Sequence, residues 1–267
     1  MNLQKRSRQV FLLAFLWVFP VLLHGEESVK EYRNIEEMRK KAEQGDADAQ
    51  YALGFCYNSG LGVEKNEAEA VIWYRKAAEQ GVADAQAQLG FCYDTASGVN
   101  KNNAEAVVWY RKAAEQENAG GQYSLGDCYA KRRGVEKNEV EAVRWYRKAA
   151  EQGYVQAQFI LGYCYASGRG VEKNEAEAVK WYRKGADHDH APSQCNMAYM
   201  YAQGCGVVKN DIEAYKWFLL SAAKGFKAAK ENMEVSEKIL TPEQRAEGQR
   251  LATEWQAAFE KRKQESE

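Results

Sequence analysis

Two short motifs in the C-terminal third of the chain combine residue types that could carry out chemistry. Ser221 and Lys224 have the Ser-x-x-Lys spacing of penicillin-recognising enzymes, but no Ser-Asp-Asn or Lys-Thr-Gly sequence completes such a site. His188 and His190 form a His-x-His pair with an aspartate before each. A rigid metal site would need further ligands from elsewhere in the fold. We therefore expect no catalytic residue, no metal site and no cofactor, and interpret the histidine segment as a solvated turn.

The chain repeats itself every 36 residues. This step separates four cysteines and also five tryptophans, namely Cys56, Cys92, Cys128 and Cys164, and Trp73, Trp109, Trp145, Trp181 and Trp217. A period in this range is typical of helical units that stack into an extended array. The predicted repeats span residues 42–77, 78–113, 114–149, 150–185 and 186–221.

Each repeat is predicted to contain two helices, called here helix A and helix B. In the first repeat, helix A runs from about Ala47 to Asn58, and a glycine-rich loop follows it. Gly62, which recurs in every repeat, is expected to need a backbone conformation that a Cβ atom disfavours. Helix B begins at Asn66, a strong N-cap with Glu69 placed three residues later as in a capping box.

The repeated residues resemble the Sel-1-like repeat (SLR), a relative of the tetratricopeptide repeat. The resemblance rests on Ala49-Gln50-Tyr51-Ala52-Leu53-Gly54, Gly60-Leu61-Gly62-Val63, Lys65-Asn66 and Ala70-Val71-Ile72-Trp73-Tyr74-Arg75-Lys76-Ala77, and it recurs over residues 42–221. It implies an all-α, right-handed α/α superhelical solenoid of five helix-turn-helix repeats, with helix A lining a concave face. It also implies a scaffold or adaptor that binds a protein or peptide. Some SLR proteins have been linked to β-lactam binding, which is why the Ser-x-x-Lys motif matters.

The two ends of the chain differ from the repeats. Residues 1–25 have the charged start and short apolar run of a secretory signal, although an uncleaved membrane anchor is the alternative. Residues 26–41 are expected to form an N-terminal helical cap, 222–240 a degenerate half repeat, and 241–267 a C-terminal capping helix. In that last helix Leu251, Trp255 and Phe259 recur at four-residue steps, which fits either a cap over the last repeat or a docking helix for a partner.

The cysteines of the repeats are not expected to pair with one another. Equivalent positions on stacked helices lie roughly 9–10 Å apart, whereas a disulfide needs Cα atoms within about 7 Å. We expect the four repeated cysteines to be reduced and buried as small apolar residues. A bond between Cys195 and Cys205 remains open.

Charge excludes one class of partner. The chain has 37 Lys and Arg against 38 Asp and Glu, and removal of residues 1–25 would leave 34 basic residues and a net charge of −4. That balance argues against nucleic acid. The repeated glycines do not follow a strand, so they do not form a phosphate-binding loop. Lys131, Arg132 and Arg133, with Arg169 one repeat later, form a basic rim that is either solvated or contacts an acidic partner.

A binding surface is predicted from the helix A positions that vary between repeats. Positions 48, 52 and 55 lie on one helical face, away from the unchanged residues, and their equivalents include recurring aromatic rings. We expect this face to be exposed. The predicted binding residues are Phe55, Gln88, Phe91, Ser124, Asp127, Gln156, Tyr163, Asn196 and Tyr199. Unconstrained drift at exposed positions would explain the variation equally well.

These features predict an exported, non-catalytic, monomeric scaffold that binds a protein or peptide. Export would place the chain in a bacterial periplasm or outside the cell, without stable membrane insertion after the signal is cleaved. The alternatives are a cell-wall binding protein or hydrolase, acting on peptidoglycan or a β-lactam, and a structural spacer with no specific partner.

Overall fold

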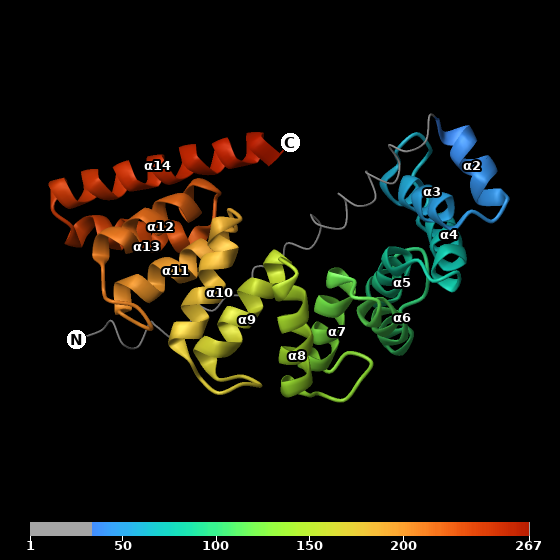
Figure 1. The fold of residues 1–267 in the computed structure, drawn as a ribbon, viewed down its shortest axis with the longest axis horizontal. Helices are drawn as coiled ribbons and strands as arrows, with labels where there is room; N and C mark the ends of the chain where they lie inside the picture. Colours follow the sequence, from blue (N-terminus) through green and yellow to red (C-terminus); the bar gives the residue numbers. More distant parts are fainter. Residues whose placement is uncertain (1–33, 267) are drawn as a thin grey trace. The chain divides into compact units, whose positions relative to one another are not determined.

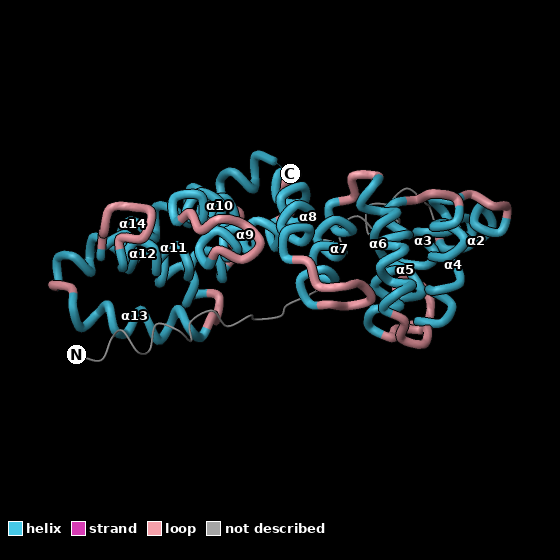
Figure 2. The backbone as a smooth tube through the Cα atoms, turned by 90° about the horizontal axis from the view of Figure 1, so that it is seen from below, coloured by secondary structure: helices cyan, strands magenta, loops and turns pink. Residues whose placement is uncertain are grey.

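The computed structural model describes residues 34–266, which contain thirteen α-helices and no strand (Figures 1 and 2). The predicted signal, residues 1–25, and the first half of the predicted N-terminal cap, 26–33, lie outside this part of the chain. Within it, no helix is long and apolar enough to cross a membrane. The described residues divide into an N-terminal body, 34–154, and a C-terminal body, 155–266.

In the N-terminal body, each helix packs against the next one along the chain. Its helices are α2 (Ile35–Glu43), α3 (Ala47–Ser59), α4 (Glu67–Glu79), α5 (Ala83–Thr95), α6 (Asn103–Glu115), α7 (Ala119–Lys131) and α8 (Glu139–Glu151). Helices α3, α5 and α7 are helix A of the first three repeats, and α4, α6 and α8 are helix B. Helix α2 packs on α3 and begins the body, as the predicted N-terminal cap requires.

The C-terminal body contains the last two repeats and the predicted C-terminal elements. Its helices are α9 (Val155–Ser167), α10 (Glu175–Asp187), α11 (Ala191–Gln203), α12 (Asp211–Ala223), α13 (Lys227–Ile239) and α14 (Pro242–Ser266). Helices α9 to α12 pack in chain order, and both α13 and α14 pack on α12. The all-helical, solenoid-like stacking predicted from the repeats is confirmed.

Every helix B begins at the predicted asparagine cap. In the first repeat, the Asn66 side-chain oxygen accepts hydrogen bonds from the backbone N–H groups of Ala68 and Glu69, each at 3.1 Å. The expected capping box does not form, however. The Asn66 N–H donates instead to the Tyr57 carbonyl at 2.8 Å, which ties the end of helix A to the start of helix B. The same bond recurs in the other repeats, from Asn102 to Tyr93, Asn138 to Tyr129, Asn174 to Tyr165 and Asn210 to Tyr201.

The loop glycine has the left-handed conformation that the sequence predicted. Its φ is +71° at Gly62 and +67° at Gly98. At Gly98, Gly134 and Gly206 the glycine is also needed for close packing on the preceding repeat. A Cβ atom at Gly98 would lie 2.0 Å from the Glu67 carbonyl oxygen, at the start of the preceding helix B.

Small and aromatic residues alternate in the interior of each repeat. Tyr74 is fully buried, and its ring lies so close to Gly54 that a Cβ atom there would be 2.7 Å from it. The recurrence of a tryptophan in every helix B predicts burial of its ring, and this prediction holds for three of them, Trp109, Trp181 and Trp217. It is wrong for Trp73 and Trp145, which are partly exposed. The side chains of Lys76 and Lys148 cover these two rings, with Nζ 3.9 and 4.5 Å from the ring centroids.

Helix α14 packs on the last helix B, α12. It starts with a capping box, in which Thr241 and Gln244 exchange hydrogen bonds of 3.0 and 3.3 Å. Trp255 meets the buried Trp217 edge to face, with ring centroids 5.6 Å apart, and stacks on Phe259.

Candidate functional site

The predicted binding face is less exposed than the sequence suggested. We call positions 48, 52 and 55 and their equivalents the helix A face. Phe55, Gln88, Ser124 and Asp127 are 3, 7, 6 and 3% exposed, so the expectation that they face solvent is wrong. The other predicted residues are partly buried, namely Phe91, Gln156, Tyr163, Asn196 and Tyr199. Every predicted binding residue therefore contributes to packing, and the partly buried ones also present a surface.

Two polar residues of this face are buried beside tyrosines of the preceding repeat. Burial raises the pKa of Tyr51 and of Tyr110, and Gln88 and Ser124 respectively oppose that rise. Neither tyrosine hydroxyl has a hydrogen-bond partner among the described residues, so these polar side chains are buried by packing rather than by a hydrogen bond to the hydroxyl. Variation between repeats at this position therefore does not identify a solvent-facing surface.

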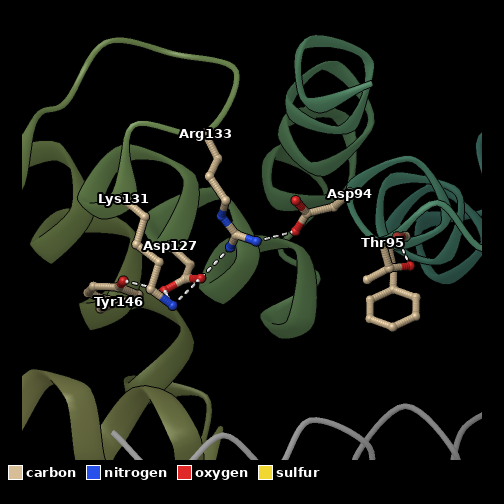
Figure 3. Close-up of polar contacts among 7 residues, drawn as sticks. Asp94, Thr95, Asp127, Lys131, Arg133 and Tyr146 are labelled. Atoms are coloured by element: carbon tan, nitrogen blue, oxygen red, sulfur yellow. Dashed lines mark hydrogen bonds and ion pairs between the residues drawn. The ribbon is translucent and has the colours of Figure 1, made fainter. Parts of the chain in front are cut away.

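Charged residues of the N-terminal body form one buried network (Figure 3). Arg133, in the loop after α7, bridges two carboxylates: its Nη1 lies 2.5 Å from Asp94 Oδ2, and its Nη2 pairs with Asp127. Asp127 also pairs with Lys131 at 2.8 Å and accepts a hydrogen bond from the Tyr146 hydroxyl at 3.3 Å. Burial alone would lower the pKa of Arg133, but the two carboxylates outweigh it and raise that pKa. The network joins α5, α7 and the loop that follows α7.

This network changes the interpretation of the basic rim. Arg133 and Lys131 pair with carboxylates of the chain itself, and Lys131 is also exposed to solvent. Arg132 is exposed and has a positive φ of 56° at the end of α7. Arg169, in the C-terminal body, lies over the ring of Tyr163 with its guanidinium carbon 5.9 Å from the centroid. The network also contains Asp94, which reasoning from the sequence did not single out.

Two ladders of side-chain hydrogen bonds explain the unchanged tyrosine and glutamine positions. The guanidinium of Arg111 donates to the Tyr129 hydroxyl at 2.8 Å, and the same pair recurs as Arg39 with Tyr57, Arg75 with Tyr93 and Arg183 with Tyr201. Gln50 donates to the Ala42 carbonyl at 3.0 Å and accepts a hydrogen bond from Gln80 at 2.8 Å. Both ladders connect one repeat to the next, so these residues serve the stack itself.

The motifs that could have carried chemistry are occupied with structural contacts. Ser221 is fully buried and donates to the Ala191 carbonyl at 2.7 Å, while Lys224 pairs with Asp189 at 2.6 Å. These contacts leave neither side chain positioned to activate the other. His188 is exposed, whereas His190 is partly buried, and the described residues contain no group of side chains that could hold a metal ion.

All six cysteines are free thiols in the structure, including Cys195 and Cys205, whose pairing had remained open. Burial raises the pKa of Cys56 to about 11 and that of Cys92, Cys128 and Cys195 to about 12. A thiol with such a pKa is protonated at neutral pH and is a poor nucleophile. The cysteines therefore act as packing residues here.

Comparison with known proteins gives a consistent result. The family model of the Sel1 repeat matches residues 47–82, 83–118, 119–154, 155–190 and 191–226. Each match begins five residues after the corresponding predicted repeat, at the start of helix A. No protein of curated function matches the chain significantly.

Two solved structures are similar over most of the chain. A Sel1 repeat protein from Oxalobacter formigenes is 38% identical with a TM-score of 0.71, over 80% of this chain and 86% of that one. A protective antigen of uropathogenic Escherichia coli with an SLR fold is 37% identical with a TM-score of 0.74. That alignment covers 88% of this chain and 53% of the antigen.

Proposed function

Because the chain belongs to the Sel1 repeat family, we propose that it is an exported, non-catalytic scaffold that binds a protein or peptide through its helix A face. Sel1 repeat proteins generally mediate protein–protein interactions, and their solenoid fold is typically a non-enzymatic scaffold. The contacts of Ser221 with the Ala191 carbonyl and of Lys224 with Asp189 argue against catalysis at the Ser-x-x-Lys motif.

The observation that carries the proposal is the partial burial of three aromatic rings at one repeated position. Phe91 lies on this face in the N-terminal body, and Tyr163 and Tyr199 lie on it in the C-terminal body. A ring that is held in place on one side and open on the other loses little conformational entropy on binding. Such aromatic anchors contribute much of the affinity at protein interfaces. The fully buried Phe55 and Asp127, at the same position, are excluded from this role.

The test is a double substitution, Phe91→Ala with Tyr163→Ala, compared with a control on helix B. The partner is first isolated from the native cell envelope and identified by mass spectrometry, and its affinity is then measured with purified protein. We expect the double variant to bind at least about tenfold more weakly, which corresponds to about 1.4 kcal/mol. Val108→Ala is the control because Val108 is an exposed apolar residue of α6.

Normal binding by the double variant would remove the helix A face as the site. Circular dichroism and thermal unfolding of both variants establish whether the fold is retained. If the double variant unfolds while the control does not, the rings act as core residues and the proposal fails. Co-sedimentation with peptidoglycan without any protein partner would favour the cell-wall alternative.

Export is proposed from the sequence of residues 1–25. The basic start, the apolar run from Val10 to Leu23 and the small residue Gly25 have the order of a cleavable signal. We expect the mature chain to begin near Glu26. Mass spectrometry of the native protein tests this directly, and an intact Met1–Gly25 segment would contradict it.

A further inference from the structure

The junction between α10 and α11 differs chemically from the other junctions between repeats. Residues 187–190 have the sequence Asp-His-Asp-His. The equivalent residues after α4, α6 and α8 have the sequences Glu-Gln-Gly-Val, Glu-Gln-Glu-Asn and Glu-Gln-Gly-Tyr. In those three, the glutamine donates to a glutamine of helix A, as Gln80 does to Gln50. His188 replaces that glutamine, and its Nδ1 lies instead 3.2 Å from the carbonyl of Lys184 on its own helix.

His190 is packed into the C-terminal body. Its ring meets Phe159 of α9 edge to face, with centroids 5.5 Å apart, and its Nδ1 lies 2.8 Å from the hydroxyl of Ser193. Ser193 is fully buried, and a Cβ atom at Gly185 would lie 2.3 Å from its oxygen. The imidazole is therefore partly buried between α9 and the first turn of α11, where packing against Phe159 limits the access of water to it.

The charged groups around the junction do not compensate a protonated His190. Burial lowers the pKa of His190 to about 4, and the charge of His188 acts in the same direction. Asp189 is engaged by Gln194 of α11 and by Lys224 after α12. The remaining carboxylate is Asp187, whose charged neighbours are His188 and three basic residues of α10, α12 and α14, namely Arg183, Lys216 and Arg262.

We propose that the α10–α11 junction is a pH-sensitive switch that loosens the C-terminal body in mildly acidic solution. The unfolded chain binds a proton at His190 near its ordinary pKa of about 6.5, whereas the folded chain resists protonation until about pH 4. Since the folded pKa is the lower one, the stabilisation is present above pH 6.5 and is lost as the pH falls towards 4. From these two pKa values, the equilibrium constant for unfolding is expected to be roughly twentyfold larger at pH 5 than at pH 7.

Substitutions that mimic other junctions of the same chain provide the test. His190→Asn copies Asn118, which stands at the equivalent position and caps α7 with a hydrogen bond of 2.8 Å to Gly121 N. His188→Gln restores the residue of the three other junctions and leaves His190 in place. The full chain and both variants are unfolded in urea at pH 7 and pH 5, and NMR follows the imidazole resonances during a pH titration.

We expect the wild type and His188→Gln to show a larger rise in the unfolding constant between pH 7 and pH 5 than His190→Asn. The difference should be roughly twentyfold. We also expect the His190 resonance to titrate below pH 5. A His190 resonance that titrates near 6.5, or an equal acid response in His190→Asn, would overturn the proposal. If His190→Asn fails to fold, His190→Phe is used in its place in the urea experiment, because Phe226 stands at the equivalent position after α12. The NMR titration of the wild type needs no variant and tests the proposal by itself.

Discussion

Substituting one loop glycine should disrupt the contact between two repeats. Gly134 lies in the loop between α7 and α8 with a φ of +69°, and a Cβ atom there would be 2.1 Å from the Asn103 carbonyl oxygen. Real Cβ contacts keep at least about 3.0 Å, so the start of α6 must move. Gly153 is the matched control, because its φ is +89° but a Cβ atom there would have nothing within 4 Å.

The expected loss for Gly134→Ala has three parts. The left-handed conformation costs an alanine about 1–2 kcal/mol, overpacking about 1–3 kcal/mol, and disturbance of the Asn102 cap next to Asn103 about 1 kcal/mol. The lower entropy of the unfolded alanine chain returns about 0.4–1 kcal/mol. We therefore expect the free energy of unfolding to fall by about 2–5.5 kcal/mol for Gly134→Ala. Only the conformational and entropy terms apply to Gly153→Ala, which should lose about 0–1.6 kcal/mol.

Urea denaturation followed by tryptophan fluorescence measures both variants against the wild type. The quantity that matters is the difference between them, since the left-handed conformation is common to both. A difference of at least about 2 kcal/mol is expected from the packing and cap terms. Equal losses for the two variants would refute the claim that the loop glycine is needed for contact between repeats.

Three further substitutions or reactions test other parts of the fold. Trp109→Ala should lower the free energy of unfolding by about 3–5 kcal/mol because the ring is buried. Trp145→Ala should lower it by less, because that ring is partly exposed. Equal losses of unfolding free energy in chemical denaturation would contradict this ranking. Arg133→Met should lower the free energy of unfolding by about 3–5 kcal/mol, because it removes a positive charge that pairs with two buried carboxylates. Arg132→Met, at the exposed neighbouring residue, should lower it by less than about 0.5 kcal/mol. Similar denaturation midpoints for the two variants would argue against the network. The thiols of the four repeated cysteines should resist alkylation in the native protein and react fully in denaturant without a reductant. Mass spectrometry counts the alkylated cysteines under both conditions. A missing adduct in denaturant would reveal a disulfide.

Recurring residues made the local structure of each repeat predictable. Asn66 and Gly62 act within a few residues of their own position, one by capping a helix and the other by adopting a left-handed turn. Such effects depend on backbone geometry that every repeat shares, so comparison within one chain was enough to identify them. The capping box failed where a non-local contact intervened, because the carbonyl of Tyr57 takes the Asn66 N–H.

The buried charge network was outside the reach of that reasoning, although its signal was present. Asp94 and Arg133 are 39 residues apart and belong to different repeats. The residues at the equivalent positions of the first repeat are uncharged, Asn58 for Asp94 and Leu61 for Arg133. Asp127 is the only acidic residue at its position among the five repeats. Unusual charges of opposite sign in adjacent repeats therefore indicated compensation, but only the packing of α5 on α7 brings them together.

The sequence by itself determined that this chain is a stack of five two-helix repeats, because the period and the caps are properties of consecutive residues. The tertiary structure decided which faces of those helices meet water. Gln88 and Ser124 varied between repeats as surface residues do, yet both are buried in the stack beside tyrosines of the preceding repeat. Whether a helical position is exposed depends on what the adjacent repeat places against it, and spacing along one helix does not contain that information.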